Sequence, residues 1–64
     1  MQLQTGLKTL RARRRMTQAQ VAHRAGVTKF YISQLETGLR KNPSLPVLRR
    51  LAKALGVPVA ELLK

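Results

Sequence analysis

The chain has 64 residues, of which 13 are lysine or arginine and two are acidic, so its formal net charge is +11. This length allows one small domain with a thin core, for which a hydrophobic fraction of 44% is sufficient. The absence of cysteine and the single histidine exclude disulfide bonds, thiolate metal sites and a multi-histidine metal site within the chain.

The strong positive charge favours an anionic partner, and nucleic acid is the leading candidate. An enzyme is not expected, because two acids, one histidine and no glycine-rich phosphate loop supply no catalytic constellation. We therefore expect no cofactor and no metal. No apolar run approaches the roughly 20 residues of a membrane helix, and the first residues lack the apolar core of a signal peptide. We expect a cytoplasmic protein that does not bind membranes.

Apolar residues at helical spacing predict an all-α fold, a compact bundle of about five short helices. The first helix carries its apolar face at Leu3, Leu7 and Leu10 and ends in three arginines at 13–15, where cations suit the negative end of the helix dipole.

The second and third helices are marked by residues typical of helix ends. Thr17 begins the second helix and forms a capping box with Gln20, and Gly26 ends it. Thr28 caps the third helix, which stops at Gly38. Their apolar faces are lined by Val21, Ala22, Ala25, Ile32 and Leu35, with Val27 buried in the turn between them.

A polar, basic loop at 39–43 precedes the fourth helix. Ser44 caps that helix, and Gly56 ends it. Its apolar side is expected to consist of Leu45, Leu48, Leu51, Ala52 and Leu55. Pro58 opens a short fifth helix, which carries Val59, Leu62 and Leu63.

Residues 17–38 form the most informative unit, two short helices around a tight turn. Ala22 is small enough for the helices to cross closely, and Gly26 permits the turn. Val27, Ile32 and Leu35 hold the second of these helices against the body. The free side of that helix then points outward, which is the geometry that a reader of the DNA major groove needs.

Several segments resemble the Cro/C1-type helix-turn-helix family of phage and bacterial repressors, which includes the Xre-like regulators. They are TQAQVA at 17–22, AGVT at 25–28, YISQLETG at 31–38, NPSL at 42–45 and LAKALGV at 51–57. The resemblance covers nearly the whole chain and implies one lambda-repressor-like DNA-binding domain over residues 1–64. It implies a transcriptional repressor that binds double-stranded DNA and acts by occupying its operator. The chain departs from the family at Pro58, where a capping serine or aspartate is common.

The resemblance also implies which residues contact base edges, namely Thr28, Lys29, Phe30, Ser33 and Gln34. Their chemistry agrees: Lys29 can donate to guanine O6 and N7, and Gln34 can pair with adenine N6 and N7. Phe30 and the methyl group of Thr28 can contact a thymine methyl. The alternatives are that Lys29 reaches a phosphate and that Phe30 folds back as a lid on the core.

Phosphate contacts are implied at the start of the first motif helix, at Thr17 and Gln18, where free N–H groups favour anions. Tyr31 is expected to pack partly against the scaffold with its hydroxyl near a phosphate. The loop after Gly38 is the second implied phosphate contact, through Arg40, Lys41 and Asn42. The alternative is that these are ordinary solvated residues.

A salt bridge between Arg11 and Glu36 follows from their positions. Arg11 lies four residues after Leu7, and Glu36 lies four residues after Ile32, so each faces the core. Because a buried charge is unfavourable unless it is paired, we predict a bidentate bridge, which the resemblance also implies. Glu36 is thus interpreted as structural, and Arg11→Ala should lower the melting temperature by several degrees.

Family members usually bind palindromic operators as two-fold dimers, with half-site centres about 34 Å apart. A weak homodimer contact is predicted at the apolar C-terminal end, formed by Val57, Val59, Leu62 and Leu63. The alternatives are that these residues complete the core, or that a dimerisation or sensor domain follows Lys64 in a longer protein.

Two other functions compete with a repressor. One is an antitoxin or adaptor whose main partner is another protein, with DNA binding secondary; a toxin-like neighbouring gene would favour it. The other is a basic helical protein that binds RNA or membranes. The capped, turn-rich layout argues against a membrane helix, and the single Phe30-Tyr31 pair is a poor stacking platform for RNA.

Overall fold

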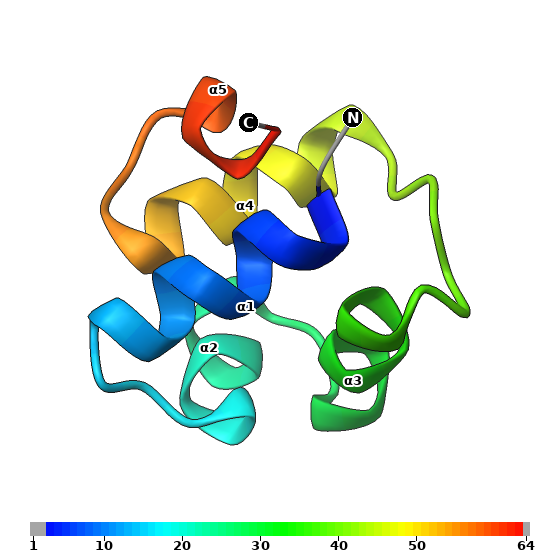
Figure 1. The fold of residues 1–64 in the computed structure, drawn as a ribbon, viewed down its shortest axis with the longest axis horizontal. Coiled ribbons are helices and arrows are strands. Elements are labelled where there is room, and N and C mark those ends of the chain that lie inside the picture. Colours follow the sequence, from blue (N-terminus) through cyan, green and yellow to red (C-terminus); the bar gives the residue numbers. More distant parts are fainter. Residues whose placement is uncertain (1–2, 64) are drawn as a thin grey trace.

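The computed structural model describes residues 3–63, which form five α-helices in the predicted order and no strand (Figure 1). The all-α fold predicted from the sequence is therefore confirmed. The helices are α1 (Leu3–Arg13), α2 (Gln18–Ala25), α3 (Lys29–Thr37), α4 (Leu45–Leu55) and α5 (Val59–Leu62).

The ends of α2 and α3 follow the capping residues that the sequence indicated. The backbone N–H of Gln20 donates to Thr17 Oγ1 at 3.1 Å, and the N–H of Thr17 donates to Gln20 Oε1 at 2.8 Å, which completes the capping box. Gly26 ends α2 at φ 71°, a left-handed conformation that favours glycine. Thr28 then begins α3, where its Oγ1 accepts from the N–H of Tyr31 at 3.0 Å. Two short helices are thus joined by a turn of fixed geometry.

The α5 helix lies directly against α1, and Gly6 makes this approach possible. A Cβ atom on residue 6 would overlap the backbone carbonyl oxygen of Leu62. Pro58 provides no side-chain cap for α5, so this helix depends on its packing. That packing is complete at Leu62, which has no exposed surface.

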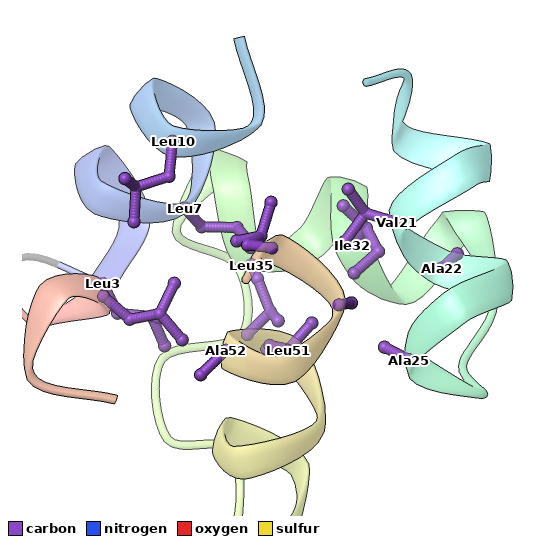
Figure 2. Close-up of a cluster of buried hydrophobic side chains, with 13 residues drawn as sticks. Leu3, Leu7, Leu10, Val21, Ala22, Ala25, Ile32, Leu35, Leu51 and Ala52 are labelled. Carbon is purple, nitrogen blue, oxygen red and sulfur yellow. The ribbon is translucent and has the colours of Figure 1, made fainter. Parts of the chain in front are cut away.

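The core lies between all five helices. Figure 2 shows Val21 of α2 and Ile32 of α3 pointing toward each other, with Leu7, Leu35 and Leu51 beside them. The largest fully buried side chains come from every helix: Leu7, Val21, Ile32, Leu35, Leu51, Leu55 and Leu62. At about 2 kcal/mol for each fully buried aliphatic side chain, this cluster dominates the stability of so small a domain.

Helix α3 is held on two sides, by α2 and by α1 (Figure 1). Val21 of α2 and Ile32 of α3 are both fully buried in the core that these two helices share. The loop that follows α3 runs along the outside of the molecule before it reaches α4, and Leu39, Arg40, Lys41 and Asn42 are all exposed there. One side of α3 and this loop are therefore open to a partner.

Two expectations about buried residues are wrong. Leu45 was predicted on the apolar side of α4, but it is 52% exposed because it is the first residue of α4 and extends past the edge of the core. Leu62 was predicted in a dimer contact, but it is fully buried under α1 within its own chain. Val57, Val59 and Leu63 are half-buried and pack against the same core, so some of their surface stays open.

Candidate nucleic-acid interface

Helix α3 separates its residues onto two faces. Ile32, Leu35 and Glu36 are buried. On the other side, Lys29 and Phe30 are exposed and Ser33 and Gln34 are half-buried. Residues at i, i+1, i+4 and i+5 share one face of a helix, so these four form a single strip, which starts beside the exposed cap Thr28. All five residues predicted to contact bases are thus on the open side of the molecule.

Phe30 is the most exposed residue of this strip, with 70% of its surface accessible. It therefore does not fold back as a lid on the core, which was the alternative considered from the sequence. Tyr31, by contrast, is half-buried and packs against the core. The adjacent aromatic residues point to different sides of α3, because neighbouring positions on a helix are about 100° apart.

A network around Glu36 ties α3 to the rest of the domain. The Nε and Nη2 atoms of Arg11 donate to the two carboxylate oxygens of Glu36 at 2.7 and 2.9 Å, a bidentate pair. Arg11 Nη1 also donates to the carbonyl oxygen of Met16 at 3.0 Å. Gln18 Nε2 donates to Glu36 Oε1 at 3.1 Å. The salt bridge is thus part of a larger network that joins α1, α2 and α3.

Burial and hydrogen bonding act in opposite directions on Glu36, which is only 8% exposed. Burial by itself would raise the pKa of this carboxyl group, since it disfavours the charged form. The hydrogen bonds from Arg11 and Gln18, with the charges of Arg11 and Lys8, outweigh burial and hold the pKa below its ordinary value. The Glu36 hydrogen bond in turn raises the pKa of Arg11. Both groups are charged, and the pair has a structural role.

The start of α2 and the start of α3 border one open groove of about 610 Å³. Thr17 and Gln18 line it, as does Lys29 from the open strip of α3. Arg11 and Arg15 add positive charge, and none of the described residues that line the groove is acidic. Two residues predicted to contact phosphate are thereby placed beside one predicted to contact a base.

The loop after α3 is bonded back to the open side of that helix. The backbone N–H of Arg40 donates to the carbonyl oxygen of Gln34 at 3.1 Å, and Arg40 Nε donates to Gln34 Oε1 at 3.2 Å. The Arg40 guanidinium also lies 5.0 Å from the centre of the Tyr31 ring, within cation–π range. Lys41 and Asn42 follow it and are exposed. The three loop residues therefore lie at the end of α3 opposite the groove.

Sequence reasoning missed several side-chain contacts in this region, among them those of Gln18 and Gln34. Gln18 was assigned only to phosphate, but it also completes the Glu36 network. Gln34 was assigned only to bases, but its amide oxygen is bonded to Arg40. Neither contact has a signal in the spacing of the residues, because each joins a helix to a segment whose position depends on the packed fold.

Comparison with known proteins agrees with this geometry. A helix-turn-helix family matches residues 7–62, which is most of the chain. The chain belongs to the Cro/C1-type helix-turn-helix family. The match includes every residue of the open strip, the groove and the loop.

Proteins with sequences similar to this chain are named as repressors and transcriptional regulators. The immunity repressor protein of Bacillus phage phi105 is 39% identical over 54 residues, which are 84% of this chain and 37% of that protein. The transcriptional regulator SinR of Bacillus subtilis is 35% identical over 57 residues, 89% of this chain and 51% of SinR. The chain therefore spans about a third to a half of these two Cro/C1-type relatives.

A solved structure has the same fold. The clp gene regulator ClgR from C. glutamicum superimposes with a TM-score of 0.87 at 33% sequence identity, covering 95% of this chain and 78% of that one. These names favour a regulator over the antitoxin alternative. Within residues 3–63 of this Cro/C1-type domain, no helix has both the length and the apolar character required to cross a membrane.

Proposed function

We propose that this domain binds double-stranded DNA sequence-specifically and represses transcription by occupying an operator. In this proposal α3 enters the major groove, and its open strip contacts base edges. The residues with this role are Thr28, Lys29, Phe30, Ser33 and Gln34. Phosphate contacts come from Thr17 and Gln18 beside the groove, from the Tyr31 hydroxyl, and from Arg40, Lys41 and Asn42 in the loop.

The observation that carries the proposal is the position of polar and basic groups on both sides of an outward-facing helix. Lys29 is exposed at the start of α3, and Arg40 and Lys41 are exposed beyond its end. A helix with positive groups at each end can rest between two phosphate backbones while its middle meets the bases. Glu36 does not oppose this charge, since it is buried in its ion pair with Arg11.

The proposal includes binding as a weak homodimer on a palindromic operator, with half-sites about 34 Å apart. The half-buried Val57, Val59 and Leu63 would supply the contact, without Leu62. Analytical ultracentrifugation with and without operator DNA tests this part. A monomer under both conditions would contradict it. We further propose that the domain acts in the cytoplasm and catalyses no reaction.

Selection of binding sites from a random pool of duplex DNA tests the main proposal. We expect one sequence to be enriched, and unlabelled copies of it should displace labelled operator far more effectively than random duplex does. A chain that enriches no sequence and is displaced equally by both competitors would refute specific binding. Single-stranded RNA of the same length serves as a further competitor and separates DNA binding from general attraction to polyanions.

A further inference from the structure

The contact between Arg40 and Gln34 joins a residue assigned to phosphate with a residue assigned to bases. Three interactions hold Arg40 in place: its backbone N–H to the Gln34 carbonyl, its Nε to Gln34 Oε1, and its guanidinium over the Tyr31 ring. The ring is itself fixed, because Tyr31 packs against the core. Arg40 is therefore an exposed side chain with a defined position.

This contact determines which end of the Gln34 amide is free. A guanidinium has only donors, so the amide end that faces Arg40 must be the oxygen. The amide nitrogen, with its two N–H donors, then points away from Arg40. Among the described residues it has no hydrogen-bond partner, so it is free for a ligand.

The orientation of the amide changes what Gln34 can recognise. The bidentate pairing of glutamine with adenine needs both ends, since the oxygen accepts from N6 and the nitrogen donates to N7. Because its oxygen is turned toward Arg40, Gln34 presents its two N–H donors on the other side. Guanine offers two acceptors there, O6 and N7, whereas adenine offers one acceptor beside a donor, thymine offers one acceptor beside a methyl group, and cytosine offers only a donor.

We propose that Arg40 is a positioning residue which sets the base preference of Gln34, turning it from an adenine reader into a guanine reader. This inference rests on the proposed function, because it requires that α3 meets base edges. Arg40 can still contact a phosphate through its Nη atoms, since only Nε is used for Gln34.

Lys41 supplies the matched control for Arg40. It is the next residue of the same exposed loop, carries the same charge, and has no hydrogen bond or ring contact with another described residue. Arg40→Ala and Lys41→Ala each remove one positive charge from this loop, but only the first releases the amide oxygen of Gln34. Arg40→Lys keeps the charge and removes the planar group and its Nε–H.

The test measures binding of these variants to the selected operator and to its single-base variants. Gln34→Ala identifies the base pair that Gln34 contacts, since preference is relaxed there. At that pair the unaltered chain should prefer guanine. Arg40→Ala and Arg40→Lys should each raise the ratio of adenine to guanine affinity by about fivefold or more, a change within the range of a single bidentate base contact. Lys41→Ala should weaken binding to every sequence and leave this ratio unchanged.

The outcomes separate the inference from the proposed function. If the unaltered chain prefers adenine at the Gln34 position, or if Arg40→Ala gives the same ratio as Lys41→Ala, the positioning role is refuted while DNA binding stands. If no sequence is selected at all, both proposals fail. Circular dichroism of each variant checks the fold, which should be unchanged because the side chains of Arg40 and Lys41 are exposed and that of Gln34 is only half-buried.

Discussion

Glu36 and Gln34 lie two residues apart in α3, and each has a side-chain oxygen bonded to an arginine. Glu36 is 8% exposed and accepts three hydrogen bonds of 2.7 to 3.1 Å from Arg11 and Gln18. Gln34 is half-exposed and accepts one side-chain bond, of 3.2 Å, from Arg40. Residues two apart on a helix face different sides, so one contact is inside the domain and the other is in water.

This difference shows how burial decides the role of a contact. Inside the domain, removing one partner leaves a desolvated charge without compensation, which is strongly unfavourable. In water, the same kind of bond is worth about 1 kcal/mol or less, because water competes for both partners. The inner face of α3 therefore determines whether the domain folds, whereas contacts on the outer face can be changed without unfolding the domain.

The largest expected effect is that of Arg11→Ala on the inner face. Loss of the guanidinium leaves Glu36 buried and unpaired, and we expect the free energy of unfolding to fall by about 3 kcal/mol. For a domain of this size that corresponds to a melting temperature lower by roughly 10 °C or more. Calorimetry measures the melting temperature. The control is Arg13→Ala at an exposed position, which should change the free energy of unfolding by less than about 0.5 kcal/mol. An unchanged melting temperature for Arg11→Ala would show that the buried ion pair does not stabilise the domain.

The ion pair of Arg11 and Glu36 should also make the stability of the domain depend on pH, with a smaller effect. The pKa of Glu36 lies below its ordinary value of 4.5, so the folded domain binds this proton less tightly than the unfolded chain does. The stabilisation is thus complete above about pH 4.5 and is lost as the pH falls through the lowered pKa. Urea unfolding between pH 7 and pH 3 measures this loss. The Glu36→Gln variant should be less stable at neutral pH, and its free energy of unfolding should depend less on pH. If the free energy of unfolding changes equally with pH in the variant and in the unaltered chain, Glu36 is not the group that causes the loss.

On the outer face, Gln34→Ala should change binding and leave folding intact. We expect a loss of about 1–3 kcal/mol on the selected operator, with preference relaxed at one base pair. The melting temperature should stay within about 2 °C of the unaltered chain, because no buried group loses a partner. Fluorescence anisotropy on operator and random duplex gives both affinities. Equal losses on the two DNAs would reassign Gln34 to the DNA backbone.

The smallest effect concerns Lys29, whose charge is expected to act on phosphate or guanine from the exposed start of α3. Lys29→Ala should reduce the slope of log affinity against log salt concentration by about 0.9 if it neutralises one phosphate. The control is Lys53→Ala, which removes an exposed charge from the last turn of α4. A larger change of slope for Lys53 than for Lys29 would place the DNA on another face.

Much of the fold was predictable because its signals are local. Thr17, Thr28 and Ser44 cap helices through bonds to residues three positions later. The left-handed conformation at the ends of α2, α3 and α4 favours glycine, which the sequence has there. The wrong predictions concern how deeply two leucines at the ends of helices are buried. Whether Leu45 at the first position of α4 is covered depends on neighbours from other helices, and the same holds for Leu62.

The sequence by itself determined the helices, their order, the charge of the surface and the two residues of the inner ion pair. Arg11 and Glu36 could be paired because helical periodicity places both on apolar faces, where a charge needs a partner. Only the tertiary structure decided that Gln18 joins that pair and that Arg40 holds Gln34. Such contacts join segments that are separated along the chain, and their distances are set by how the helices pack and not by any local propensity.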